Sequence, residues 1–245
     1  MNKLKRILGV LFHQQENIFS GAYFLIFKRK YKATFGSFDV PHTWSRAHFY
    51  ARFLNDGYES EERTLISKHL DKHDHVIELG ACVGVVSCLT AEIIDNGRHC
   101  VVEANPHLLP FLYKNRAQNN KKFQIIGAAL TEQKEVTFYL NRNMVGGSSQ
   151  RETNDKCPII GLSPSNINKR FGPFNTLIMD IEGGEQEFIE QHIPEQPDLE
   201  KLIIEFHPTI LGKDTIIQLK KKLVALNFTC IESIGDVDFW KRTNS

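Results

Sequence analysis

Short apolar runs alternate with segments of helical spacing through most of the chain, and this alternation limits the fold more than any other feature. Units of strand, helix and strand build parallel sheets with helices on both faces. The sequence therefore predicts an α/β fold with a doubly wound, mostly parallel sheet. Strands are predicted from Val76 and at 99–103, 123–126, 176–181, 201–206, 227–232 and 237–241, and helices at 84–94, 107–118, 184–191 and 213–226.

Further segments surround this core. Residues 18–40 are rich in Phe, Tyr and Ile and predict one or two short strands that cap one end of the core. Apolar spacing over 42–70 predicts helices that are broken at Asp56-Gly57. Residues 135–140 predict an extra strand. The segment 141–172, with many Asn, Ser, Gly and Pro residues, predicts a long loop with one helical turn.

The composition excludes several classes of protein. The chain has 245 residues, of which 41% are hydrophobic and 24% charged, values that argue against disorder, a coiled coil or a collagen-like polymer. Its five cysteines are widely spread without a CxxC pair, so neither a disulfide framework nor a zinc knuckle is predicted. No stretch approaches the roughly 18 uninterrupted apolar residues of a membrane-spanning helix. We therefore expect a cytoplasmic protein.

The start of the chain has the periodicity of an amphipathic helix, with an apolar stripe that begins at Leu4 and Ile7. Residues 1–35 carry seven Lys or Arg side chains against one Glu, a local charge of +6, so the rest of the chain sums to −5. Such a helix can contact the inner face of an anionic membrane, or pack on the main domain or a partner subunit, which is commoner. We expect this helix and the capping strands to form an extension over 1–55, followed by one domain over 56–245.

A glycine loop follows the first strand of the sheet. Gly80 and Gly84 allow a tight turn and leave room for a ligand at the N-terminus of the next helix. The following strand ends in Glu103, 23 residues after Gly80. A carboxylate at this place can accept hydrogen bonds from both ribose hydroxyls of an adenosine cofactor. The pattern indicates a nucleoside site, against the alternative of an ordinary turn and a solvated glutamate.

The loop also indicates which cofactor is bound. Cys82 occupies the second glycine position of a dinucleotide fingerprint, where the backbone must approach a pyrophosphate, and the GK[ST] ending of a P-loop is absent. A ligand with a ribose but no phosphate fits better. The sequence therefore predicts S-adenosyl-L-methionine as the cofactor.

Several motifs occur in one order along the chain: VIELGACVGVVS, VVEANP, GAAL, GGSS, LIMDIEGGEQEFI and LIIEFHP. Over about residues 54–210 the chain resembles the FkbM-type S-adenosylmethionine-dependent methyltransferases. The resemblance implies a class I, Rossmann-like methyltransferase fold, with a seven-stranded, mostly parallel sheet whose last strand is antiparallel. It also implies O-methylation of a hydroxyl on a sugar, polyketide or related natural product. One departure is Cys82, where the family often carries Asn.

The resemblance and the positions at strand ends together suggest the cofactor residues. Glu103 would hold the ribose, and other residues would form the methionine and adenine parts of the pocket. Asp180 ends a neighbouring strand and faces the same crevice, because ligands of open α/β sheets bind beyond the carboxyl ends of the strands. The remaining cofactor candidates are Glu78, Gly80, Ala81 and Gly84 for the methionine part, and Ala104, Asn105 and Ala128 for the adenine part.

Methyl transfer to a hydroxyl requires aligned reactants and removal of the hydroxyl proton. The first candidate for the proton acceptor is Asp180, with Glu182 positioning it or the substrate, and His207 is the second. Against this, Glu185 can be an acid favoured by the dipole of a helix N-terminus, and His207 can make a structural hydrogen bond. The spacing of the acids matches no standard metal site, so no metal ligand is assigned, and a divalent metal bound by these acids stays an alternative.

Four residues are candidates for binding the acceptor: Tyr58, Glu59, Ser148 and Ser149. The leading hypothesis is an O-methyltransferase for a small molecule or glycan. A nicotinamide-dependent oxidoreductase is disfavoured by Cys82. A methyltransferase acting on nucleic acid or protein, and a non-catalytic cofactor-binding module, remain as alternatives. No nucleic-acid partner is expected, because the chain outside 1–35 is acidic and lacks an N-P-P-Y motif.

Overall fold

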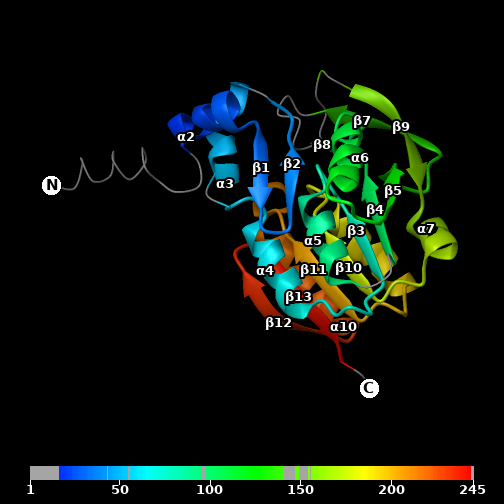
Figure 1. Ribbon diagram of the computed structural model, residues 1–245. Helices are drawn as coiled ribbons and strands as arrows, with labels where there is room; N and C mark the ends of the chain where they lie inside the picture. Colours follow the sequence, from blue (N-terminus) through cyan, green and yellow to red (C-terminus); the bar gives the residue numbers. More distant parts are fainter. Residues whose placement is uncertain are drawn as a thin grey trace.

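Figure 1 shows the computed structural model, which describes residues 17–42, 44–54, 56–94, 98–140, 147–148, 154 and 156–243. The amphipathic helix expected at the start of the chain lies outside these residues. Within these ranges, every helix is too short or too polar to cross a bilayer.

A seven-stranded sheet forms the centre of the molecule, in the order β12-β13-β11-β10-β3-β4-β5. β13 pairs antiparallel with both of its neighbours, whereas the pairs between β11 and β5 are parallel. This confirms the α/β fold and the class I methyltransferase topology that the resemblance implies. The strands are β3 (Val76–Leu79), β4 (His99–Glu103), β5 (Gln124–Gly127), β10 (Thr176–Met179), β11 (Lys201–Glu205), β12 (Phe228–Ile234) and β13 (Val237–Arg242).

Helices bury both faces of this sheet. Alternate residues of a strand point to opposite faces, so Leu79 and Met179 pack on one side with α10, while Val76 and Ile178 pack on the other with α4 and α5. The inner strands β3, β4 and β10 are buried along their whole length, because helices cover both of their faces. The helices are α4 (Ser60–His69), α5 (Val85–Ile93), α6 (Leu109–Gln118), α8 (Glu185–Glu187), η4 (Phe188–His192), η5 (Ile193–Glu195), α9 (Pro208–Leu211) and α10 (Lys213–Ala225).

The chain changes direction across the sheet between β3 and β10. From β3 it continues to β4 and β5 on one side, and later returns to β10 and β11 on the other. The helices after β3 and β10 therefore leave in different directions, and a crevice opens beyond the carboxyl ends of the two strands. Open α/β sheets bind their ligands at such a switch point.

The segment before the domain begins with helices. The sequence predicted strands over 18–40, but α2 (Ile18–Tyr23) and η1 (Phe24–Lys28) precede the hairpin of β1 (Lys30–Ala33) and β2 (Gly36–Asp39). The strand prediction is therefore wrong for the first half and confirmed for the second. The helix begins at Asn17, whose side chain accepts hydrogen bonds from the amides of Phe19 and Ser20. Burial of Gly21, Phe24 and Leu25 follows helical spacing.

The N-terminal segment shares a core with the domain. Aromatic side chains of α2 to α3, among them Phe24, Tyr31 and Phe53, pack in one cluster with residues of α5 and α6 such as Val85 and Leu112. The predicted helices before residue 70 are confirmed as η2 (Trp44–Tyr50), α3 (Ala51–Leu54) and α4. The division at residues 55 and 56 stays a prediction.

A small second sheet lies over 129–162. The prediction of a strand at 135–140 is confirmed, whereas the expected loop with one helical turn over 141–172 is wrong at its end. There, one strand pairs antiparallel with β7, and a helix begins after Ser163, whose hydroxyl accepts from the amide of Asn166. Ser and Pro in this segment mark a helix start rather than a loop. The elements are β6 (Ala129–Leu130), β7 (Glu135–Leu140), β8 (Gly147–Ser148), β9 (Lys156–Leu162) and α7 (Pro164–Phe171).

Candidate functional site

A cavity of about 280 Å³ lies at the switch point, beyond the carboxyl ends of β3, β4, β10 and β11. Most of the candidate residues meet in its walls, although they come from distant parts of the chain. Three cofactor candidates, Glu78, Ala81 and Gly84, do not line it. The candidates in the walls are Tyr58, Glu59, Gly80, Glu103, Ala104, Asn105, Ala128, Asp180, Glu182 and His207.

Gly80 joins the two sides of the crevice. Its φ is +88°, and a Cβ atom at this position would lie 1.7 Å from the carbonyl oxygen of Asp180. Its amide donates to the carbonyl of Val102, and the amide of Asp180 donates to that of Leu79, both at 2.9 Å. Only glycine allows the loop after β3 to touch the end of β10 in this way.

Glu103 is buried at the end of β4, not solvated. Its Oε2 accepts a hydrogen bond from the amide of Cys82 and its Oε1 accepts one from the amide of Asn105, both at 2.7 Å. Burial raises the pKa of Glu103 to about 7, although the two amides act to lower it. The amides fix the carboxylate, whose remaining lone pairs can accept the two hydroxyls of a ribose.

Glu78 points away from the cavity. Its Oε1 accepts from the hydroxyl of Ser87 at 2.6 Å, and its Oε2 lies 2.9 Å from Nε2 of His99. The strand alternation explains this position, because Glu78 lies on the face of β3 that packs on α5. Its carboxylate therefore supports the structure beneath the loop and does not line the cavity.

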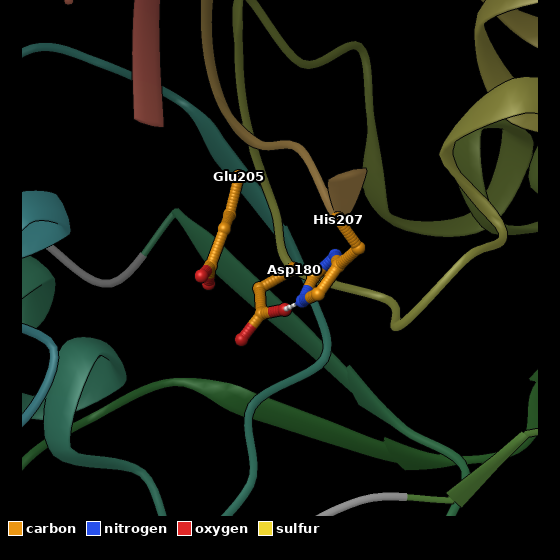
Figure 2. Close-up of side chains that lie close together, drawn as sticks. All are labelled: Asp180, Glu205 and His207. Carbon is orange, nitrogen blue, oxygen red and sulfur yellow. Dashed lines mark ion pairs between the residues drawn. The ribbon is translucent and has the colours of Figure 1, made fainter. Parts of the chain in front are cut away.

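The other side of the cavity carries a histidine held by two acids. Nδ1 of His207 lies 2.7 Å from Oε1 of Glu185, and Nε2 lies 3.4 Å from Oδ1 of Asp180. Glu185 is fully buried and also accepts from the amide of Gly183 at 3.2 Å. Figure 2 shows Asp180 between His207 and Glu205. Glu205 lies two residues before His207 in the chain. The imidazole is thus fixed, with Nε2 toward the carboxylates.

Acids crowd this side of the cavity. Burial, followed by the charges of Glu62 and Glu59, raises the pKa of Asp180 well above its usual range. Burial and the charge of Asp180 raise the pKa of Glu205 to about 10, and its side chain hydrogen-bonds to that of Glu62. Burial acts to lower the pKa of His207, but Glu185 raises it above its usual value. The carboxyls of Asp180 and Glu205 are thus harder to ionise than usual.

Sequence reasoning missed several members of this cluster. Glu205 shares a strand end with His207, and spacing of two residues on one strand was a signal that could have found it. Glu62 belongs to α4, and no pattern in the sequence indicates that it lies beside these acids. Glu185 lies in the first turn of α8, where a helix dipole favours an acid, and it also contacts the imidazole of His207, which the sequence did not indicate.

The acceptor candidates are only partly described. Tyr58 is buried, and its hydroxyl donates to Sγ of Cys82 at 3.3 Å. Glu59 begins α4 with a φ of +50°, and burial raises the pKa of its carboxyl well above the usual range. Ser148 contributes its backbone to β8, and Ser149 lies outside the described residues. The structure thus brings Tyr58 and Glu59 to the cavity.

No protein-family model and no curated protein matches this chain. Among solved structures, the chain is similar to a precorrin-6y C5,15-methyltransferase from Geobacter metallireducens (13% identity, 74% of this chain and 86% of that one, TM-score 0.48). It is also similar to an rRNA methylase from Streptococcus thermophilus (10%, 75% and 95%, TM-score 0.46). A third is Aeropyrum pernix fibrillarin with natively bound S-adenosyl-L-methionine (10%, 69% and 67%, TM-score 0.44).

The assignment of the fold rests on the strand order, with the antiparallel β13 between β11 and β12. The names of these structures concern those proteins and include rRNA methylation. The expectation that this chain has no nucleic-acid partner therefore stays a prediction.

Proposed function

We propose that this chain is an S-adenosylmethionine-dependent O-methyltransferase of the FkbM type, which methylates a hydroxyl of a sugar, glycan or related small natural product. The observation that carries the proposal is the carboxylate of Glu103, held by two backbone amides in a cavity at the switch point of a class I methyltransferase sheet. The acids and the histidine on the opposite wall supply groups for the chemistry.

The cofactor would occupy the side of the cavity formed by β3, β4 and the start of the second sheet. Glu103 would accept the ribose hydroxyls, and the small residues Gly80, Ala104 and Ala128 leave room along the wall. Asn105 is buried beside Glu103. The donor set suits a ribose without phosphates, because the described residues of the walls here offer a carboxylate and no Lys.

The acceptor would occupy the side formed by β10 and β11. There Asp180 is the first candidate to take the hydroxyl proton, with Glu182 positioning and His207 as the second candidate. Glu185 would act through His207, because its hydrogen bond fixes the ring. Tyr58, Glu59, Ser148 and Ser149 are proposed to bind the rest of the acceptor. A wall of acids also repels a phosphate backbone, which supports a small acceptor over a nucleic acid.

Isothermal titration with the demethylated cofactor product tests the cofactor site. Glu103→Ala should weaken binding at least about tenfold, roughly 1.4 kcal/mol, because the ribose loses its acceptor. Glu132→Ala, at an exposed glutamate outside the cavity, is the control and should leave the affinity unchanged. Unchanged affinity in Glu103→Ala would remove Glu103 from the site.

Two further results would contradict the proposal. Tight binding of NADH without binding of S-adenosylmethionine would favour an oxidoreductase. Cofactor binding without methylation of sugars, glycans, RNA or protein would favour a non-catalytic module. Methylation of RNA or protein alone would show that the acceptor is not a small molecule or glycan.

The N-terminal segment is proposed to contact an anionic membrane surface. The outer side of α2 and η1 exposes five large apolar side chains, and basic residues follow directly. An apolar row next to a basic cluster suits the interface of an anionic bilayer. The apolar residues are Ile18, Phe19, Tyr23, Ile26 and Phe27, and the exposed basic ones are Lys28, Arg29 and Lys30.

Sedimentation with anionic and with neutral vesicles tests this contact. The full chain should sediment with anionic vesicles, and both deletion of residues 1–15 and the double variant Phe19→Ser, Phe27→Ser should weaken this. Ile217→Ser, on the exposed side of α10, is the matched control. A full-length chain that ignores vesicles would show that the segment packs on protein instead.

A further inference from the structure

Three side chains at the ends of β10 and β11 converge on one point. One carboxylate oxygen each of Asp180 and Glu205, and one ring nitrogen of His207, all lie within 4.8 Å of one another (Figure 2). Oxygen ligands of divalent cations lie about 2.0 to 2.6 Å from the ion, so two ligands on one ion are at most about 5 Å apart. The cluster therefore already has the dimensions of a cation site.

The orientation of His207 is the orientation of a metal ligand. A histidine that binds a metal through one nitrogen usually donates the other N–H to a carboxylate. Here Nδ1 lies 2.7 Å from Oε1 of the fully buried Glu185, which can accept the N–H. In the neutral ring, the lone pair of Nε2 therefore faces Asp180 and Glu205.

Nε2 of His207 and Oδ1 of Asp180 face each other without a hydrogen bond between them. Oδ1 of Asp180 is buried without a hydrogen bond and lies 3.4 Å from Nε2 of His207. A carboxylate oxygen and a nitrogen lone pair repel each other unless a proton or a metal ion lies between them. Arg52 is the one Lys or Arg among the described residues that line the cavity, against eight acids. The protein thus supplies lone pairs and negative charge here, but little positive charge.

We infer that Asp180, Glu205 and His207 bind one divalent cation, with Glu185 positioning the imidazole. Two carboxylate oxygens and one imidazole nitrogen suit Mn²⁺ or Mg²⁺, with Zn²⁺ as a competitor. Three protein ligands leave coordination positions open toward the cavity. This site is one that the spacing of the acids in the sequence did not predict.

The inference deepens the proposed function. The role of the cation rests on that function, whereas the binding of the cation does not. An oxygen of the acceptor would take an open position on the ion. A bound cation lowers the pKa of a coordinated hydroxyl and orients it, so the hydroxyl loses its proton more easily. In this arrangement the carboxylate oxygen of Asp180 that does not bind the ion accepts the hydroxyl proton as the oxygen takes the methyl group, and His207 acts on the acceptor through the cation.

Titration of Mn²⁺ into the EDTA-treated and dialysed full-length protein, without cofactor, tests the site. Electron paramagnetic resonance of free Mn²⁺ should show one bound ion per chain. Asp180→Asn, Glu205→Gln and His207→Gln should each raise the Kd at least about tenfold, and Glu185→Gln about 10- to 100-fold as a positioning residue. Mn²⁺ should also raise the Tm of the natural chain but not of Asp180→Asn.

Glu187→Gln is the matched control, because Glu187 lines the same cavity outside the cluster and should keep the natural affinity for Mn²⁺. Asp180→Asn and Glu205→Gln each remove an acid from a crowded site, so both variants should fold, as circular dichroism would show. A natural chain that binds no Mn²⁺ at millimolar concentration, or variants that bind it equally well, would overturn the inference.

Titration of the demethylated cofactor product separates this result from the proposed function. If that product binds and Mn²⁺ does not, the cation site is wrong while the methyltransferase proposal stands. If Mn²⁺ binds with the predicted variant pattern but the product does not, the cation site stands and the proposed function fails.

Discussion

The two sides of the cavity stabilise their buried acids in different ways. On the cofactor side, Glu103 is a single carboxylate whose oxygens accept from the amides of Cys82 and Asn105. On the acceptor side, Asp180 and Glu205 lie among other acids with His207 beside them, and the pKa of both carboxyls rises. Backbone amides remain in place at every pH, whereas neighbouring acids help only when protonated.

The cofactor side is therefore preorganised, whereas the acceptor side is not. The cofactor side holds its carboxylate in position before any ligand arrives, which favours binding without rearrangement. The acceptor side needs positive charge from outside, as a proton, a sulfonium or a metal ion. The comparison therefore predicts that changes on the two sides affect stability in opposite directions.

The largest effect should come from the residue that joins the two sides. Gly80→Ala forces an L-residue to a φ of +88° and places Cβ 1.7 Å from the carbonyl oxygen of Asp180. Strain and overpacking together should lower the free energy of unfolding by about 4 kcal/mol, measured by urea denaturation. Binding of the demethylated cofactor product and of Mn²⁺ should both be lost, because the loop can no longer touch β10.

Gly235→Ala is the control for this variant. Gly235 has a φ of +60°, but the nearest atom to an added Cβ is the flexible Cγ of Glu61 at 3.3 Å. Gly235→Ala should lower the free energy of unfolding by only about 1 to 2 kcal/mol, which is the penalty of the left-handed conformation. Equal losses in the two variants would mean that the contact with Asp180 does not matter.

A second prediction uses the pH dependence of the cofactor side. The pKa of Glu103 is about 7 in the folded protein against a usual 4.5, so the folded state binds the proton more tightly. The stability that this proton contributes is present below about pH 4.5 and is lost as pH rises to about 7. Across this range the natural chain should lose about 2 to 3 kcal/mol more than Glu103→Gln. Urea unfolding at pH 5, 6, 7 and 8 measures this, and parallel curves would contradict it.

Local motifs made the cofactor side predictable from the sequence. The strand ending in Glu103 and the glycine loop are each encoded by consecutive residues, and both lie where the pattern placed them. Glu78 was not predictable in the same way, because its direction depends on which face of β3 packs on α5. Alternation along one strand gives two faces, and tertiary packing decides which one meets the ligand.

The acceptor side depended on contacts between distant segments. Asp180 and Glu205 become neighbours because β10 and β11 pair in parallel, and Glu62 arrives from α4, more than one hundred residues earlier. The role of Glu185 required the position of His207, 22 residues later in the chain. The sequence indicated which acids exist but not that they share one space.

A third prediction tests the acidic side in the absence of metal. In EDTA at pH 7.5, Asp180→Asn should raise the free energy of unfolding by about 1 kcal/mol, because the variant no longer keeps a proton on a buried acid that would ionise in the unfolded chain. Glu103→Ala should instead lower stability, since it leaves the buried amides of Cys82 and Asn105 without an acceptor. Thermal unfolding of both variants gives the sign, and destabilisation by Asp180→Asn would end the contrast between the two sides.

The smallest effect concerns the residue at which the chain departs from the family it resembles. Cys82 has a φ of +49°, and its contribution to Glu103 comes from the backbone amide, which any residue except Pro supplies. Asn tolerates this left-handed conformation better than Cys, so Cys82→Asn should stabilise the chain by less than about 1 kcal/mol and leave cofactor affinity within about twofold. Cys82→Val should instead destabilise it, because a β-branched residue is strained at positive φ. Urea denaturation and calorimetric titration measure both effects. If Cys82→Asn lost cofactor binding, the Sγ that accepts from Tyr58, and not the amide, would be the group that orders the cofactor side.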